Sequence, residues 1–558
     1  MSATRLLPLT VTGALITVAG FWFLRGGTTG TPSDVTAGPA PLVAQAATLP
    51  EPPRVYLDTT YTPPTGRTLP VLAGGDFQAA LNTAQPGDVI TLQAGATFTG
   101  PFTLPSKSGS TYIIIRSSTA DATLPPPGQR ITPAYAAVLP KIRGTPALTA
   151  GSGAHHFRFI GVEFLPPAGL SILTLLDLQG TNLIFDRCYI HGDPVAGGRL
   201  GVALNGARNA VIDSYLSDWK HTSFDAQAIA GWNAPGPFKI VNNYLEGAGE
   251  NLIFGGIGDP ASAALIPSDI EIRGNYFFKP LSWKVGAPAY AGVNWVVKNL
   301  FELKNAHRVL VDGNIFEQVW TGNTNSQGGL AIVFTPRNQY GSAPFSVVTD
   351  VTFTHNIVRH ATAGFNLLGW DNINASQQLQ RVLIQHNLLT NIGEFPDVTF
   401  GGFFTGMLAL LKEEPADVII DHNTAVQTGA PLYAQNQAGR PPATGFVFTN
   451  NITLNNQGVS GAGTDGNPIL TLSTYFPDAK FEGNVIVGGI ARHYPPRNFF
   501  PASLNATGFV NRQQGDYRLT ATSRYKRAGM GGSDPGVDLE ALRAALGLMA
   551  GRSLPPKK

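Results

Sequence analysis

The sequence of 558 residues predicts an all-β protein that folds as a parallel β-helix, and three observations support this. A short phrase of alternating apolar and polar residues recurs along the chain and ends at a corner residue, most often asparagine. The recurrences are 26 to 42 residues apart, a variation that loops can absorb. Each unit contains three short strands rather than a pair of helices. Such regular repetition is typical of a solenoid, and strand-only units make it a β-helix.

The pattern is clearest in residues 299–320, which form the sequence NLFELKNAHRVLVDGNIFEQVW. Three short alternating runs lie in this stretch, and corners separate them. Because successive side chains of a strand point to opposite faces, Phe301 and Leu303 should face the core. By the same alternation, Glu302 and Lys304 should point outward.

The corner residues repeat along most of the chain. Each lies at a bend, where an asparagine side chain can bond its own backbone or the asparagine of the next coil. Eleven corners predict about eleven or twelve coils. An alternative, unrelated hairpins of a β-sandwich, would require the asparagines to share one strand end by chance. The predicted corner residues are Val162, Cys188, Tyr215, Asn243, Asn275, Asn314, Asn356, Asn387, Asn423, Asn451 and Asn484.

On these phrases the chain resembles the right-handed parallel β-helices of the pectin-lyase-like superfamily over residues 69–538. Residues 74–105 are similar to the N-terminal cap that is common in that superfamily, and residues 515–529 resemble its last coil. The fold carries lyases, hydrolases, epimerases and phage tailspikes, so the resemblance implies a fold rather than one activity.

Both ends of a solenoid need a cover, because an open end would expose core side chains and unpaired strand edges. Residues Phe77–Thr83, after Asp76 as N-cap, are predicted to form a short helix over the first coil. Residues 538–549 have an amphipathic pattern. They predict a helix that caps or braces the last coil, within a C-terminal helix and tail at 539–558.

The N-terminal segment predicts export. Residues 6–24 carry no charge and are flanked by Arg5 and Arg25. This uncharged segment is long enough to be part of a signal peptide or of an uncleaved signal anchor within residues 1–25. Residues 26–68 form a linker and lead-in rich in Pro, Gly and Thr. The rest of the chain is therefore expected to be secreted, periplasmic or at the cell surface. If residues 6–24 are not cleaved off, they would attach it to the membrane.

Composition excludes several classes of function. Charged residues make up 13% of the chain and the formal net charge is +2, so no strong field favours nucleic acid. Cys188 is the one cysteine, so no intrachain disulfide can form. The sequence contains no His/Cys metal cluster, phosphate loop or nucleophile elbow, and no metal-ligating residue is predicted.

The chemically suggestive pair is Lys304 and Arg337. The stretches FELKNAHRVLVDGNIFE and GGLAIVFTPRNQ resemble, over about 40 residues, the alginate lyase and chondroitinase B family. There a lysine at a strand end and an Arg-His-Gly element one coil later supply base and acid. The resemblance implies that Lys304 and Arg337 are catalytic, although Asn338 and Gln339 stand where the family has His and Gly. The alternative is that both are solvent-exposed side chains paired to Glu302.

The same family places calcium-binding carboxylates shortly before its lysine. Here Val297 and Asn299 stand at those positions, so the expected calcium ligands are not seen. Calcium is the one cofactor that the resemblance suggests.

Other side chains near the predicted site are expected to bind substrate. Long inter-corner gaps on these coils predict large loops, which is where sites on rigid scaffolds are usually built. For Glu250, a solvated turn is the competing interpretation. The predicted substrate-binding residues are Glu302, Asn338, Trp320, Trp370 and Glu250.

The sequence leaves three functions open, each with a polysaccharide or cell-surface glycan as partner. The first is an exported polysaccharide-active enzyme, a lyase of uronate-containing glycans. The second is a non-catalytic carbohydrate-binding or surface structural protein, with tryptophans as sugar platforms. The third is a glycoside hydrolase or epimerase, which would show two carboxylates about 5 to 10 Å apart across a cleft.

Overall fold

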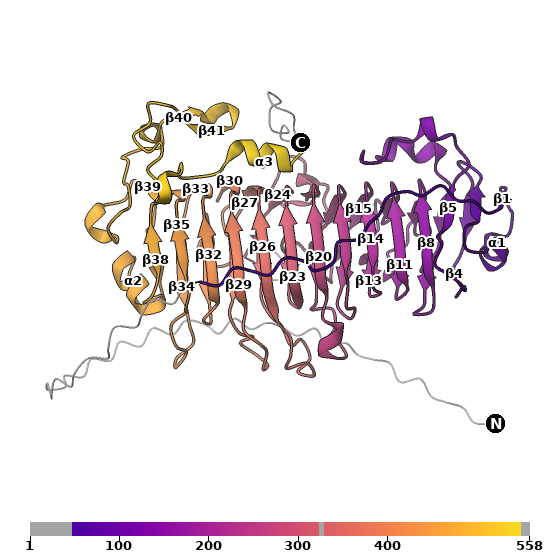
Figure 1. Ribbon diagram of the computed structural model, residues 1–558, viewed down its shortest axis with the longest axis horizontal. Coiled ribbons are helices and arrows are strands. Elements are labelled where there is room, and N and C mark those ends of the chain that lie inside the picture. Colours follow the sequence, from indigo (N-terminus) through magenta and orange to yellow (C-terminus); the bar gives the residue numbers. More distant parts are fainter. Residues whose placement is uncertain (1–46, 323–327, 548–558) are drawn as a thin grey trace. The chain divides into compact units, whose positions relative to one another are not determined.

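The fold is a stack of coils built from three parallel β-sheets. A computed structural model describes residues 47–322 and 328–547, all within one compact unit of the chain. The sheets contain 14, 13 and 12 strands, and each coil adds one strand to each in turn (Figure 1). The predicted parallel β-helix is confirmed. The sheets hold more strands than the eleven predicted corners, because the first coils precede the first corner.

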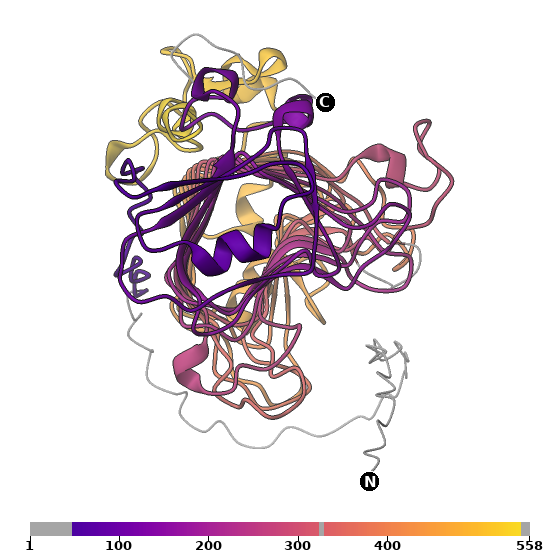
Figure 2. The same cartoon turned by 90° about the vertical axis from the view of Figure 1, so that its right-hand side faces the viewer.

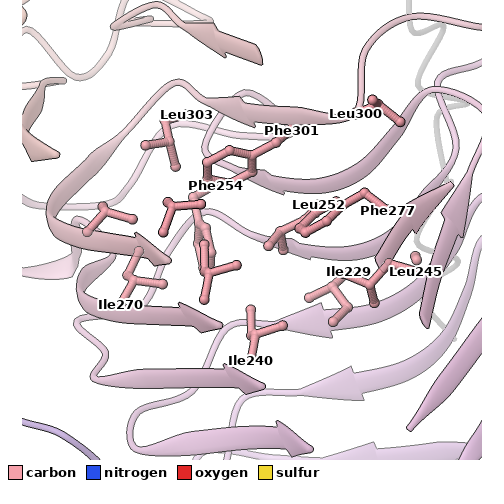
Figure 3. Packing of buried hydrophobic residues seen from close by; sticks show 14 of the residues in the cluster. Ile229, Ile240, Leu245, Leu252, Phe254, Ile270, Phe277, Leu300, Phe301 and Leu303 are labelled. Atoms are coloured by element: carbon pink, nitrogen blue, oxygen red, sulfur yellow. The ribbon is translucent and has the colours of Figure 1, made fainter. Parts of the chain in front are cut away.

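The coil that the sequence shows most clearly has the predicted three strands. They are β22 (Phe301–Leu303), β23 (Ala306–Asp312) and β24 (Ile315–Val319). Phe301 and Leu303 are fully buried, and Figure 3 shows them among apolar side chains of neighbouring coils. Alternation therefore turns the side chain between them, Glu302, to the outer face of the sheet.

The 12-stranded sheet carries the predicted site on its outer face. Its strands are in register from coil to coil, so outward side chains form columns. The column that contains Glu302 is Ala230, Ile253, Glu302, Val333, Asn366 and Leu410. The strands of this region are β13 (Leu200–Leu204), β16 (Gln227–Gly231), β19 (Glu250–Phe254), β22, β25 (Leu330–Phe334), β28 (Ala363–Leu368), β31 (Ala409–Lys412), β34 (Leu432–Gln435) and β37 (Ser460–Gly461).

Asparagine side chains form a ladder at the corner between the 14- and 13-stranded sheets. The Asn314 Oδ1 atom accepts hydrogen bonds from the backbone N–H and the Nδ2 of Asn275, at 2.9 and 3.0 Å. Asn314 Nδ2 donates to Asn356 Oδ1 at 3.0 Å. The same pattern continues through Asn484, so each amide satisfies buried backbone groups of the coils beside it.

One predicted corner residue is wrong. The ladder position of that coil is Ser214, and Tyr215 begins the next strand, β15 (Tyr215–Trp219). The backbone N–H of Cys188 donates to Ser214 Oγ at 3.0 Å, and the Ser214 N–H donates to Asn243 Oδ1 at 2.9 Å. A serine hydroxyl thus supplies the same acceptor as an asparagine amide.

Helices cover both ends of the stack. The predicted helix α1 (Phe77–Thr83) is confirmed, and its N-cap Asp76 accepts a hydrogen bond from the Ala79 N–H at 2.8 Å. Figure 2 shows α1 lying across the open end of the first coils. At the other end α2 (Pro468–Tyr475), which follows an Asn N-cap, packs against β34 and β37.

The C-terminal helix forms, but it does not brace the last coil. Helix α3 (Leu539–Ala545) begins after Asp538, whose side chain accepts hydrogen bonds from two N–H groups of the first turn. Its apolar side chains pack against Ile357 and Leu388, which belong to middle coils. The chain has turned back along the outside of the 13-stranded sheet, where those apolar residues need a cover.

Residues 515–529 do not form the last coil that their resemblance implied. The strand within them, β41 (Asp516–Leu519), pairs antiparallel with β40 (Phe509–Asn511) in a separate two-stranded sheet. The last strands of the stack are β38 (Lys480–Glu482) and β39 (Val485–Val487).

Residues 47–68, the described part of the linker and lead-in, cross the outer face of the 14-stranded sheet as an extended strap (Figure 1). Side chains of the sheet hold its backbone: Asp350 accepts from the Glu51 N–H at 3.0 Å, and Asp269 accepts from the Arg54 N–H at 2.9 Å. The predicted export segment, residues 1–25, lies outside the described residues. In the part of the chain that is described, no helix is long and apolar enough to cross a membrane.

Candidate functional site

Five charged side chains from three successive coils meet on the outer face of the 12-stranded sheet. They are Asp225, Glu250, Lys298, Glu302 and Lys304, and together they form what we call the lysine–carboxylate cluster. Glu250 begins β19 and Glu302 is the middle residue of β22, so strand register sets the spacing of the two carboxylates. Asp225 lies just before β16, on the coil before β19.

Lys298 reaches the cluster from a long loop between β21 (Tyr276–Phe278) and β22. The loop's last residues are tied to the coil before them. The Lys298 N–H donates to the Ala248 carbonyl at 3.1 Å, and the Asn299 N–H donates to the Gly249 carbonyl at 3.0 Å. The base of the lysine side chain is therefore fixed by backbone hydrogen bonds.

The Lys298 ammonium is the centre of the cluster. Its Nζ lies 2.6 Å from Glu250 Oε1, 3.0 Å from Glu302 Oε2 and 3.5 Å from Asp225 Oδ2. Burial opposes its charge, but the carboxylates of Glu250, Glu302 and Asp225 outweigh this effect and raise the pKa of Lys298 well above its usual range. Lys298 is therefore a permanent cation at neutral pH.

The two glutamates of the cluster titrate in opposite directions. Burial, reinforced by the charges of Asp225 and Glu302, raises the pKa of Glu250 to about 7. For Glu302, burial acts upward, but the ammonium groups of Lys298 and Lys304 prevail and lower its pKa below the usual range. Glu250 can thus hold a proton near neutral pH while Glu302 stays ionised.

Lys304 has the properties of a lysine that can act as a base. Its side chain is 13% exposed, and its Nζ lies 3.5 Å from Glu302 Oε1. Burial lowers the pKa of Lys304, and the Glu302 carboxylate only partly opposes this. The side chain lies against Gly256, where an added Cβ would fall 3.0 Å from the Lys304 Nζ. A glycine at that position therefore leaves the space that Lys304 fills.

Arg337 lies on the coil after Lys304, as predicted. Strand β25 ends at Phe334, before Pro336, and the Arg337 N–H donates to the Lys304 carbonyl at 2.9 Å. Its guanidinium Nη1 donates to Asp371 Oδ1 and Asn372 Oδ1, both at 2.6 Å. The hypothesis that both cations pair with Glu302 therefore describes Lys304 but not Arg337.

A second buried lysine supports the cluster from the neighbouring coil. Lys279 is fully buried, and its Nζ donates to the carbonyls of Ala248 and Gly249 at 3.0 and 3.1 Å and to Asn251 Oδ1 at 3.0 Å. Burial lowers the pKa of Lys279 to about 7. Since these carbonyls belong to the turn before Glu250, Lys279 stabilises the backbone that positions that carboxyl group.

Three predicted binding residues have structural partners instead of an open face. Asn338 is buried, and its side-chain amide bonds backbone groups of Ala343 and Ala375. Trp320 is 6% exposed and packs in an apolar cluster with other tryptophans. Trp370 has the Arg440 guanidinium 5.5 Å from the centre of its ring. Neither tryptophan presents a bare platform to a sugar.

With Lys298 in place, the cluster does not suit calcium. Within residues 47–322 and 328–547, no group of three or more His, Cys, Asp or Glu side chains could hold a metal ion. The three carboxylates of the cluster already surround the Lys298 ammonium. In addition, the side chains of Gln227 and Asn299 donate N–H groups to Glu250 and Glu302, whereas calcium requires oxygen ligands.

Two cavities of about 220 and 370 Å³ lie elsewhere, beside the strap on the outer face of the 14-stranded sheet. Their walls include Tyr112 and His156 in the smaller cavity and Tyr61 and Arg116 in the larger one. The chemistry of the cluster gives a stronger reason than cavity size for placing the site on the 12-stranded sheet, because perturbed pKa values concentrate at functional sites.

Sequence reasoning missed Lys298 and the roles of Asp225 and Asp371. Lys298 lies in a loop with no period, so alternation says nothing about the direction of its side chain. One indication was available, because Lys298 precedes Glu302 by four residues. The sequence places Asp371 in the loop after a strand of the same sheet as Arg337, but it does not show that the two side chains bond.

No protein-family model matches the chain, and no curated protein matches it. Among solved structures, the alginate lyase AlyGC of the PL6 family is similar with a TM-score of 0.50 and 14% identity, over 88% of this chain and 59% of that one. The pectate lyase Pel9A is similar with a TM-score of 0.32 and 15% identity, over 85% of this chain and 96% of that one. A mannuronic acid specific polysaccharide family 6 lyase from human gut microbiota gives 0.42 and 14%, over 86% and 99%.

The chain thus spans about three fifths of the length of AlyGC. At 14% identity the likeness to that protein concerns the fold alone. With the three all-parallel sheets, it shows that the protein is a right-handed parallel β-helix.

Proposed function

We propose that the protein is a polysaccharide lyase that cleaves a uronate-containing glycan by β-elimination at the lysine–carboxylate cluster. The observation that carries the proposal is the Lys304 amine. It is mostly buried, its pKa is lowered, and it lies one coil from Arg337. A lysine whose pKa is lowered, on the coil next to one that carries a second cation, suits proton removal next to a carboxylate.

In this proposal Lys304 Nζ accepts the proton from the sugar carbon that bears the carboxylate. The electron pair of that C–H bond forms a carbon–carbon double bond, and the neighbouring glycosidic C–O bond breaks. Lys304 then donates that proton to the leaving oxygen, which departs as a hydroxyl group and returns the lysine to its neutral form. Arg337, which Asp371 orients, offers the positive charge that stabilises the substrate carboxylate as negative charge develops on it.

The glutamate pair gives a specific reason to consider a glycoside hydrolase. Carboxyl groups whose pKa values are driven apart often form an acid and a base, as Glu250 and Glu302 could. Yet both are within 3.0 Å of one ammonium group, and their side chains are 1% and 3% exposed. A glycosidic bond has no room between them, so the geometry favours elimination.

A non-catalytic glycan-binding protein is the alternative from a different class. It predicts exposed aromatic platforms, whereas Trp320 is buried and Trp370 is covered by Arg440. The charged character of the outer face supports an enzyme over a binding module. A protein named as an alginate lyase shares the fold, which makes acidic polysaccharides the first substrates to test.

The proposal is tested by incubating the purified protein with a panel of acidic polysaccharides and following the absorbance of the unsaturated product. Lys304→Ala should lower the rate by a factor of about 100 to 10,000, the usual contribution of a general base. Lys412→Ala is the matched control. Lys412 occupies the equivalent register position in β31, and burial lowers its pKa too, but the charges that act on it are those of Glu413 and Arg337 and not the carboxylates of the cluster.

Full activity of Lys304→Ala, or an equal loss in the Lys412 control, would exclude the proposed base. Urea unfolding checks that both variants stay folded. Lys304→Ala should cost about 1 to 3 kcal/mol, because the buried Glu302 loses one of its two cations and keeps Lys298.

A further inference from the structure

We propose that Lys298 is the resident cation of this site, and that its ammonium group occupies the position which a divalent metal would take among Asp225, Glu250 and Glu302. The inference concerns the cation requirement of the site described under Proposed function and rests on that assignment for its catalytic meaning. Its test measures metal binding instead of turnover, so the two can fail separately.

The first argument is coordination by carboxylates. One ammonium group has three hydrogens to donate, and the Lys298 Nζ has three carboxylate neighbours at 2.6, 3.0 and 3.5 Å, one from each of three successive coils. The lysine side chain is 11% exposed. Because the ammonium group is this well enclosed, a dissolved cation cannot readily take its place among the three carboxylates.

The second argument is the need for a compensating charge. Glu250 and Glu302 are almost completely buried and adjacent, and two such carboxylates cannot both be ionised without a nearby cation. In many proteins a divalent metal fills this role. Here the cation is covalently tethered, and backbone hydrogen bonds from Lys298 and Asn299 to the preceding coil hold its base in place.

The third argument comes from the amide side chains around the carboxylates. Gln227 Nε2 donates to Glu250 Oε2 at 2.7 Å, and Asn299 Nδ2 donates to Glu302 Oε2 at 3.0 Å. The Asn299 Oδ1 atom is buried, and it has no hydrogen-bond partner among the described residues. An oxygen ligand therefore lies unused on the amide that contacts Glu302.

Two consequences follow. The wild-type protein should need no divalent cation, because its cation is part of the chain. Removing the lysine should uncover a latent site, since three carboxylates and the Asn299 oxygen are oxygen ligands of the kind that calcium prefers.

The experiment is isothermal titration calorimetry of calcium chloride into the wild-type protein, Lys298→Ala and the double variant Lys298→Ala/Glu302→Gln. Lys298→Ala is expected to bind calcium with a Kd of about 10⁻⁴ M, at the tight end of the range for extracellular calcium modules. Wild type should give no such binding, and the double variant should lose most of the affinity gained. Lys298→Arg, which keeps a cation, should behave as wild type.

A second measurement keeps the test decisive if Lys298→Ala does not fold. Lys298→Gln removes the charge and retains most of the side chain. Its melting temperature should rise with added calcium and should not rise with sodium chloride at the same ionic strength. The proposal is overturned if neither variant responds to calcium. It is also overturned if wild-type protein binds calcium and Glu302→Gln abolishes that binding.

Discussion

Replacing Glu302 by glutamine is expected to move the pH dependence of elimination toward lower pH. The Glu302 carboxylate lies 3.5 Å from the Lys304 ammonium and raises the pKa of that lysine, against the larger lowering by burial. Removing the negative charge lowers the pKa of Lys304 further. The neutral amine that serves as base is then present at lower pH, so the acid limb of the kcat/KM profile shifts downward.

The size of the shift follows from the distance between the charges. Two unit charges 3.5 Å apart interact by about 1 kcal/mol in water and by about 5 kcal/mol at an effective dielectric constant of about 20. One pKa unit corresponds to about 1.4 kcal/mol. Because Lys304 is 13% exposed, its environment lies between these limits, and we expect a shift of about 1 to 3 pH units.

The assay is kcat/KM on the most reactive polysaccharide as a function of pH, for wild type and Glu302→Gln. Glu413→Gln is a control on the same side of the solenoid, because its carboxylate pairs with Arg440 and lies beside Lys412. The control should leave the profile in place. An acid limb that stays fixed or moves to higher pH in Glu302→Gln would refute the assignment of Lys304 as the base.

Three further outcomes are expected. Asn314→Ala leaves buried backbone groups of the ladder without partners, so urea unfolding should show a loss of about 2 to 5 kcal/mol, and a loss below about 1 kcal/mol would contradict the ladder's role. Burial and neighbouring histidines lower the pKa of His386 to about 4, and its Nδ1 accepts from the Asp538 N–H, so stability is present above pH 6.5 and lost as pH falls through 4. His386→Asn, which suits the local φ of 53°, should reduce the loss of unfolding free energy over that window by about 1 to 2 kcal/mol, and an unchanged pH dependence would argue against this role of His386. Gly256→Ala should displace Lys304 and lower kcat more than it raises KM, whereas unchanged kcat would show that Lys304 does not need this space.

Most of the fold could be predicted because one physical rule repeats. Each coil must turn at the same corner, and an asparagine such as Asn314 satisfies buried backbone groups there. The corner position requires a side chain that accepts a hydrogen bond, and this need not be asparagine. This explains why Tyr215 was wrongly predicted as a corner residue. In that coil Ser214 provides the acceptor, and an adjacent aromatic residue belongs to the next strand. The C-terminal chain follows no such repeat, and its path over Ile357 and Leu388 depends on which apolar surface is left to cover.

The candidate site could be predicted only in part, because only some of its residues lie on the repeating strands. Alternation in β22 turns Glu302 outward, and the coil period brings Arg337 beside Lys304. Lys298 and Asp225 come from segments outside the strands, so their meeting with Glu302 depends on loop paths that have no sequence period. Their charges change the chemistry of the site, because they decide which carboxyl group keeps a proton.

We propose that this protein breaks a glycosidic bond by elimination, with its own lysines and without a metal. The most direct test is mass spectrometry of the products formed from an acidic polysaccharide, with a strong chelator present. We expect products with an unsaturated sugar at the new non-reducing end, lighter by one water than the products of hydrolysis, and a rate equal to that without chelator. Saturated products, or a reaction that the chelator stops, would contradict the proposal.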